Sequence, residues 1–258
     1  MGQMMTEYRV VTALDREAYG RLNGRLQATQ LPEFLNHDEV VVRYWDLLED
    51  RFAEYQFLLV DDATGEPVGR GHSIPLRYEG EWSALPSGGL DWALEKGFSD
   101  HEAGREPNLF SALFIVISRH HLGAGLSYRM LTAMRAIGRG NGLEHLIAPV
   151  RPSAKHQYPL IPMEDYCGWT RPDGSPHDPW IRVHVRSGGT ILYPCSEAMV
   201  VRDTVDRWAG WTGLEFPGDG SFIVPGGLVP VTVNLCDNQV SYFEPGVWIL
   251  HQTGDSGD

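Results

Sequence analysis

The chain has little cysteine, no long apolar run and few basic residues. Its three cysteines, Cys167, Cys195 and Cys236, are too few and too widely spaced for a disulfide framework or for a metal site. No run of about 18 apolar residues predicts a membrane-spanning helix. The first residues lack the basic and then apolar pattern of a secretory leader. We therefore expect a reduced, cytoplasmic protein that binds no metal and no membrane.

Acidic residues outnumber basic ones. The sequence has 34 Asp and Glu against 21 Lys and Arg, which gives a formal net charge of −13 at pH 7. Because phosphate contacts need clustered lysine and arginine, this balance disfavours a nucleic acid or an anionic membrane as partner. It suits a cationic or amine-bearing substrate, or it contributes only to solubility.

The hydrophobic pattern predicts strands interspersed with helices. Apolar runs predict strands at 8–14, 55–61, 68–74, 109–118, 143–150, 190–201 and 229–235, with the segment 109–118 central and buried. Helical spacing and capping residues predict helices at 15–28, 38–52, 89–97, 125–139 and 178–187. We expect one mixed α/β domain over 1–258, with insertions at about 79–108 and 151–177 that are rich in turn-forming or aromatic residues.

The loop "RHHLGAG" (119–125) joins the most apolar strand to a helix. Such a turn presents free backbone N–H groups and the positive end of a helix dipole, which suits a pyrophosphate. Gly123 and Gly125 allow the backbone to approach a ligand closely. The loop lacks the third glycine of the dinucleotide fingerprint and the Gly-Lys-Ser/Thr of a Walker loop. A tight turn without any ligand is the alternative.

The stretch "FIVISRHHLGAGLSYRMLTAMRAIGRGNGLEHLIAPV" (114–150) resembles the central motif of the GNAT N-acyltransferase superfamily. In that motif a strand leads to Arg/Gln-x-x-Gly-x-Gly/Ala, followed by a helix, a glycine turn and a further strand. Here His120 stands where Arg or Gln is usual, with Arg119 beside it. The resemblance implies an α/β fold with a mixed, mostly antiparallel central sheet flanked by helices.

The same resemblance implies a site for acetyl-CoA or another acyl-CoA. In the family the loop binds the pyrophosphate of coenzyme A, and the strand before it pairs with the pantetheine amides. The residues expected to bind this cosubstrate are Ile115, Val116, Ile117, His120, His121, Leu122, Gly123, Ala124, Gly125, Leu126 and Ser127.

A second family signature, Asn-x-x-Ala-x-x-x-Tyr-x-x-x-Gly-Phe, is similar to the predicted helix 178–187. The position of its tyrosine, four residues before Gly188, is occupied by His184. Because that tyrosine often protonates the departing thiolate, the resemblance implies that His184 is the catalytic acid, and histidine has a suitable pKa for proton transfer. The alternative is a packed helix residue between Val183 and Val185.

The segment "DPWIRVH" (178–184) also resembles the decarboxylase-type GNAT domains of polyketide loading modules. There a histidine on this helix and a threonine on the preceding strand act on malonyl-CoA. Here the strand "IAPVRPS" has no threonine, and Ser153 is the available substitute. A malonyl-CoA decarboxylase and S-acyltransferase that works with an acyl carrier protein is therefore the second reading.

The acceptor side is less defined. Direct transfer needs a base for the amine, and the strand 109–118 has no Asp or Glu. His72, Glu164 and Asp165 are candidates, and the base stays unassigned. The insertion 151–177 predicts an acceptor pocket walled by Tyr158, Tyr166 and Trp169, or else a flap packed on the core. Segments 208–216 and 242–248 indicate packing, with Glu244 as a further amine-binding candidate.

We expect an acyl-CoA-dependent acyltransferase that moves an acyl group, acetyl first, to an amine of a small molecule in secondary metabolism. The alternatives are the malonyl-CoA decarboxylase above and a non-catalytic protein that senses coenzyme A.

Overall fold

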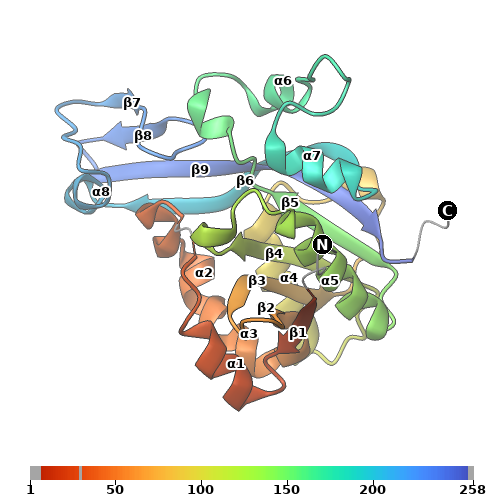
Figure 1. Cartoon of the computed structure of the whole chain (residues 1–258). Helices are drawn as coiled ribbons and strands as arrows, with labels where there is room; N and C mark the ends of the chain where they lie inside the picture. Colours follow the sequence, from red (N-terminus) through yellow and green to blue (C-terminus); the bar gives the residue numbers. More distant parts are fainter. Residues whose placement is uncertain (1–6, 29–30, 255–258) are drawn as a thin grey trace.

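The computed structural model describes residues 7–28 and 31–254, and its centre is a nine-stranded sheet (Figure 1). The strand order is β1-β2-β3-β4-β5-β9-β8-β7, and β6 also pairs with β9. The strands are β1 (Tyr8–Thr12), β2 (Gln56–Asp61), β3 (Pro67–Leu76), β4 (Leu109–Ile117), β5 (His145–Val150), β6 (Thr190–Asp203), β7 (Gly220–Phe222), β8 (Val231–Asn234) and β9 (Gln239–Gln252). Among the described residues every pairing is antiparallel except β4 with β5, so the expected mixed, mostly antiparallel sheet is confirmed.

Helices cover both faces of the sheet. They are α1 (Arg16–Asn23), α2 (Glu39–Tyr44), α3 (Leu48–Arg51), α4 (Gly89–Glu102), α5 (Leu126–Gly140), α6 (Met163–Cys167), α7 (Pro179–Arg186) and α8 (Val205–Thr212). Helix α5 lies on the near face in Figure 1 and α4 on the far face. Contacts of β3 agree with this arrangement. A Cβ on Gly69 of β3 would meet Met130 of α5, and a Cβ on Gly97 of α4 would meet Ile74 of β3. Strand β4 therefore lies between two helical layers.

Local sequence signals explain where several helices begin. Asp15 accepts a hydrogen bond from the Ala18 N–H, and Asp178 accepts from the N–H groups of Trp180 and Ile181, so both predicted N-caps are confirmed. The predicted helix 38–52 is instead divided into α2, a 3₁₀ turn at Trp45–Leu47, and α3. The turn directs the residues after α2 toward β3.

The first predicted insertion contains part of the core. Helix α4 extends to Glu102 rather than ending near 97, and its Ala93, Leu94 and Phe98 are buried. It packs against both β3 and β6. The segment 79–108 therefore supplies a layer of the fold in addition to its loops.

The longest segment whose secondary structure was not predicted lies late in the chain. Segment 242–248 belongs to the 14-residue strand β9, and the Trp-rich segment 208–216 includes the end of α8. Strand β9 pairs with β6 along one edge and with β5 and β8 along the other, which joins the two halves of the sheet. The pair Pro245–Gly246 interrupts its apolar pattern, so the sequence alone did not indicate a strand.

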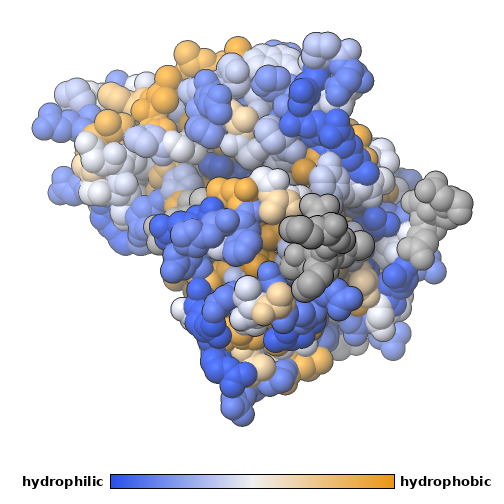
Figure 2. Space-filling view, viewed as in Figure 1, coloured by the Kyte–Doolittle hydropathy of each residue, from blue (hydrophilic) through white to orange (hydrophobic). Residues whose placement is uncertain are grey.

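The near surface is mainly hydrophilic, with separate apolar patches (Figure 2). Across residues 7–28 and 31–254, no helix has the length and apolar character needed to cross a membrane.

Candidate active site

Strands β4 and β5 diverge soon after they meet. Strand β4 pairs with β3 along its whole length, but its parallel ladder with β5 contains only Phe110 with Leu146 and Ser111 with Ile147. Beyond Ser111 the β5-facing edge of β4 leaves this ladder. A strand edge of this kind presents backbone N–H and C=O groups to an extended ligand. The predicted pantetheine segment Ile115–Ile117 lies in this part of β4.

The predicted phosphate loop follows directly from that edge. Gly123 and Gly125 have φ angles of +81° and +73°, a region that favours glycine. Gly125 is the N-cap of α5 and makes no side-chain capping hydrogen bond, so the helix N-terminus keeps backbone N–H groups without a side-chain cap. A Cβ at either glycine would meet nothing within 4 Å. The loop therefore has both the donors and the space for an anionic group.

The side chains of the predicted loop residues have distinct surroundings. His120 is exposed, and its Nε2 lies 3.0 Å from Oε1 of Gln27. The Nδ1 of His121 is buried without a hydrogen-bond partner. Leu126 is buried, so any contact it makes with a ligand uses its backbone N–H. All the predicted cosubstrate residues from Ile115 to Ser127 thus lie in one continuous stretch, and their role stays a prediction.

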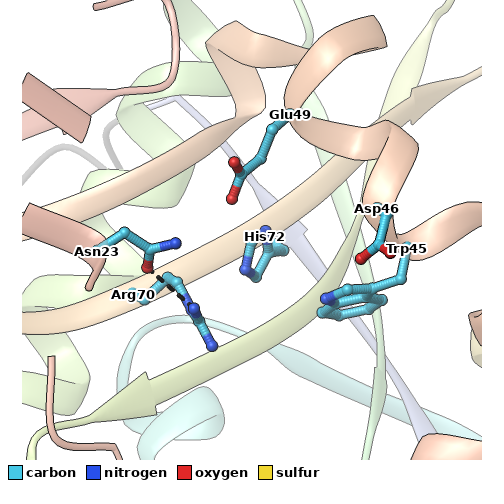
Figure 3. Close-up of a pocket in the computed structure, with 6 residues that line it drawn as sticks. All are labelled: Asn23, Trp45, Asp46, Glu49, Arg70 and His72. Carbon is cyan, nitrogen blue, oxygen red and sulfur yellow. Dashed lines mark hydrogen bonds between the residues drawn. The ribbon is translucent and has the colours of Figure 1, made fainter. Parts of the chain in front are cut away.

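A polar cavity of about 230 Å³ lies beside β3 (Figure 3). Its lining comes from the end of α1, from the turn between α2 and α3, from α3 and from β3. The lining residues are Asn23, Trp45, Asp46, Glu49, Arg70 and His72. Figure 3 shows the carboxylate of Glu49 pointing into the space above Arg70 and His72. Two carboxylates and one guanidinium therefore surround a space large enough for part of a small molecule.

The β3 residues that line the cavity pair with the diverging part of β4. In the β3–β4 register His72 is opposite Phe114 and Arg70 is opposite Val116. The ring centroids of Trp45 and His72 are 5.1 Å apart, and those of Trp45 and Phe114 are 6.1 Å apart. Phe114 directly precedes the predicted pantetheine segment. Two residues that line the cavity, Trp45 and His72, thus pack near the residue that precedes the predicted pantetheine segment.

Several buried polar atoms around the cavity have no hydrogen-bond partner. These atoms are Nε of Arg70, Nε2 of His72 and the hydroxyl of Tyr19. Arg70 donates from Nη1 to Oδ1 of Asn23 at 2.9 Å. Burial raises the pKa of Tyr19, and the negative charge of Glu49 raises it further. Because buried polar groups normally find partners, this cluster suits a polar ligand or bound water.

His184 lies away from the cavity lining, on the buried face of helix α7. Its side chain is 1% exposed, and its Nδ1 is 2.9 Å from Nε2 of His251 on β9. Burial lowers the pKa of His184 to about 3, and His251 lowers it further in the same direction. The ring is therefore neutral at pH 7. These contacts are those of a packed helix residue, which was the alternative to a catalytic role. The role of His184 as an acid stays a prediction.

The serine considered for the decarboxylase reading lies at the other end of α7. The backbone N–H of Ser153 donates to Oδ1 of Asp178, the N-cap, at 3.3 Å, while His184 is in the last turn. The structure places the two residues at opposite ends of the helix.

Tyr158, Tyr166 and Trp169 form an aromatic cluster with one another, and none of them lines the cavity. Tyr166 is 1% exposed, and its hydroxyl donates to Oδ2 of Asp178 at 2.9 Å. The buried ammonium of Lys155 donates to the backbone carbonyls of Tyr158 and Leu228, both at 2.8 Å. The contacts favour the flap packed on the core, and the acceptor-wall role stays a prediction.

The carboxylates considered on the acceptor side also lie outside the cavity. Glu244 is buried, forms an ion pair with Arg151 and accepts a hydrogen bond from the Tyr242 hydroxyl, so its oxygens are already occupied. Glu164 and Asp165 are exposed on α6.

Sequence reasoning missed most of the cavity. Of its lining residues only His72 was considered for the acceptor side. Asp46 and Glu49 stand three residues apart on the polar side of the predicted helix 38–52, a spacing that indicates a shared face. Nothing in the sequence showed that this face meets β3, because that contact is made between distant segments.

Comparison with known proteins identifies relatives over most of the chain. No protein-family model matches it. Arginine N-acetyltransferase avaD of Aspergillus versicolor is 31% identical over 246 residues, which cover 85% of this chain and 84% of the relative. Among solved structures, the loading GNATL domain of CurA from Lyngbya majuscula has a TM-score of 0.57 at 16% identity, covering 96% of this chain and 98% of that domain. The GphF GNAT-like decarboxylase in complex with isobutyryl-CoA has a TM-score of 0.50 at 15% identity, covering 96% and 100%. At these identities the comparison shows that this chain shares its fold with the two structures.

Proposed function

Because the chain belongs to the GNAT N-acyltransferase superfamily, we propose that it transfers an acetyl group from acetyl-CoA to an amine of a small molecule. The single observation that carries this proposal is the position of the polar cavity next to the diverging part of β4. Strand β4 leaves its ladder with β5 beyond Ser111, and Phe114 on this part of the strand packs against Trp45, which lines the cavity. A donor thioester on β4 and an acceptor in the cavity would meet there.

On the donor side, the backbone of Ile115–Ile117 would pair with the pantetheine amides. The N–H groups of the loop 120–127 would hold the pyrophosphate at the N-terminus of α5. Arg119 lies next to the loop and supplies positive charge in a strongly acidic protein. This arrangement holds the thioester in place and so lowers the entropic part of the barrier to transfer.

On the acceptor side, the cavity suits a small molecule that bears both charges. Asp46 and Glu49 can accept hydrogen bonds from a guanidinium or ammonium group, and Arg70 can donate to a carboxylate. The relative avaD is named for arginine acetylation. We therefore infer that arginine or a similar cationic amino acid is the first acceptor to examine.

The departing thiolate also needs a proton. The family signature implies His184 as the acid. Because its ring is neutral and a neutral imidazole is a far weaker acid than a thiol, His184 would have to take up a proton during the reaction before it could donate one to the thiolate. His184→Gln tests this role by turnover and by binding of coenzyme A. Loss of turnover with unchanged binding and fold would support it.

The proposed function is tested by calorimetric titration of the full chain with acetyl-CoA, malonyl-CoA and free coenzyme A. A thiol-release assay with arginine and a panel of amines follows. We expect saturable binding of acetyl-CoA and amine-dependent release of thiol. Binding without turnover on any amine would favour a coenzyme A sensor. Carbon dioxide release from malonyl-CoA would favour the decarboxylase, and no binding at all would contradict the donor site.

A further inference from the structure

Gln56, at the start of β2, forms a hydrogen bond with the imidazole of His72. The side chain of Gln56 is fully buried. Its amide nitrogen donates to the backbone carbonyls of Phe52 and Ser73, each at 2.9 Å. Its Oε1 lies 2.9 Å from Nδ1 of His72. Every polar atom of this amide therefore has a defined partner.

These contacts fix the tautomer of the imidazole. A backbone carbonyl only accepts hydrogen bonds, so the amide nitrogen of Gln56 must face Phe52 and Ser73, and its oxygen must face the histidine. An amide oxygen also only accepts, so Nδ1 of His72 carries the proton. The other ring nitrogen, Nε2, is then left with a lone pair and acts as an acceptor.

Nε2 of His72 has no hydrogen-bond partner, although it is buried. The residue lines the polar cavity, with the indole of Trp45 against its ring and Phe114 of β4 on the neighbouring strand. Buried polar atoms normally have partners, so an unpaired acceptor beside a cavity needs an explanation. An N–H donor of a substrate bound in the cavity would satisfy it.

We propose, on the basis of the proposed function, that Nε2 of His72 accepts a proton from the attacking amine and that Gln56 is the positioning residue that keeps Nε2 unprotonated. The amine nitrogen bonds to the thioester carbonyl carbon, and the carbon–sulfur bond breaks as the tetrahedral adduct collapses. One N–H proton of the amine goes to Nε2. The sulfur leaves as a thiolate, and the proton is passed on to it or to solvent, which regenerates neutral His72.

The charges around the ring define when this transfer occurs. Burial lowers the pKa of His72 to about 3, and Arg70 on the same strand contributes in the same direction. Asp46 and Glu49 line the cavity from the opposite side, and β4 contributes the uncharged Phe114. A ring of this basicity does not deprotonate a free ammonium ion. It accepts the proton from the nitrogen after the new bond has begun to form, when that N–H is far more acidic. The acceptor therefore reacts as its neutral amine.

The test compares His72→Gln with the matched control His156→Gln, which changes an exposed histidine outside the cavity. We expect His72→Gln to lower kcat by about 10²- to 10⁴-fold, the usual contribution of a general base. The dissociation constant for coenzyme A should change less than about twofold, and the control should retain wild-type kcat. Circular dichroism verifies that both variants are folded.

A second measurement reads the tautomer without any activity assay. In ¹⁵N-histidine-labelled wild type, long-range ¹H–¹⁵N spectra should show His72 protonated at Nδ1 and unprotonated at Nε2. In Gln56→Leu the Nε2-protonated form should appear, together with a lower kcat at an unchanged KM for acetyl-CoA. A wild-type ring protonated at Nε2 would overturn the positioning role of Gln56.

The outcomes separate this inference from the proposed function. A wild type that is inactive on every amine would overturn the proposed function and the inference with it. An active wild type with unimpaired His72→Gln would overturn the inference alone.

Discussion

Two buried histidines, His72 on β3 and His184 on α7, have much in common. Burial lowers the pKa of each to about 3, and each leaves Nε2 without a hydrogen-bond partner. They differ in what surrounds them. His72 lines a charged cavity next to β4 and is held by an amide, whereas His184 is held by a second imidazole, His251, beneath a helix. A perturbed pKa thus does not identify a catalytic group by itself, and the position of the free nitrogen relative to a cavity carries more weight.

The largest expected effect in this comparison concerns the charges around the His72 cavity. The double variant Asp46→Asn and Glu49→Gln should raise the KM for a cationic acceptor by about 100-fold or more, since each of the two charged hydrogen bonds contributes about 1.5–3 kcal/mol. Binding of coenzyme A should stay unchanged. Glu164→Gln with Asp165→Asn, an acidic pair on α6 outside the cavity, is the matched control. Equal KM values for the two double variants would contradict the proposal that the acceptor binds in the cavity.

A smaller effect is expected at the second histidine. His184→Leu leaves Nε2 of His251 buried without its partner, so the free energy of unfolding should fall by about 1–3 kcal/mol. Urea denaturation measures this loss. If this region serves packing, kcat of the remaining folded enzyme stays within about twofold of wild type. A large fall in kcat with unchanged stability would instead restore His184 as the catalytic acid and weaken the contrast.

A third prediction concerns a pH dependence of stability that both regions share. His72, His184 and His251 have pKa values lowered to about 3, about 3 and about 4, with burial as the first cause in each case. The unfolded chain binds protons at these sites below about pH 6.5, while the folded protein does not. The free energy of unfolding should therefore fall as the pH drops from 6.5 toward 4.

Each of these sites contributes a slope of at most about 1.4 kcal/mol per pH unit. His72→Gln should remove the contribution of one histidine to the slope of the free energy of unfolding against pH. The double variant His184→Gln and His251→Gln should remove the contributions of two. Thermal unfolding from pH 7 to pH 4 provides the measurement. An unchanged slope in both variants would show that these rings are protonated in the folded protein.

The sequence supported the donor half of the site better than the acceptor half. The loop 119–125 and helix α5 follow one another along the chain, so glycine positions and helical spacing were enough to locate them. The N-caps Asp15 and Asp178 were likewise predictable, because a cap acts on N–H groups two or three residues away. These features are local.

The cavity proposed for the acceptor depends on contacts between distant segments. Asp46 and Glu49 line one cavity with Arg70 although they are more than 20 residues away in the sequence, and Gln56 meets His72 only through the β2–β3 register. A helical pattern shows which residues share a face but not what that face contacts. For the same reason the aromatic residues Tyr158, Tyr166 and Trp169 suggested a pocket wall, whereas their rings pack on one another.

Strand β9 has a consequence for how the protein is made. It follows β5, β6 and β8 in the sequence, yet it is the partner of all three. While a ribosome synthesises the chain, those strands lack their common neighbour until the segment ending at Gln252 has emerged. Long-range pairings of this kind slow folding and leave strand edges exposed in the meantime. The sheet that carries the two halves of the site therefore closes only after nearly all of the described chain has been synthesised.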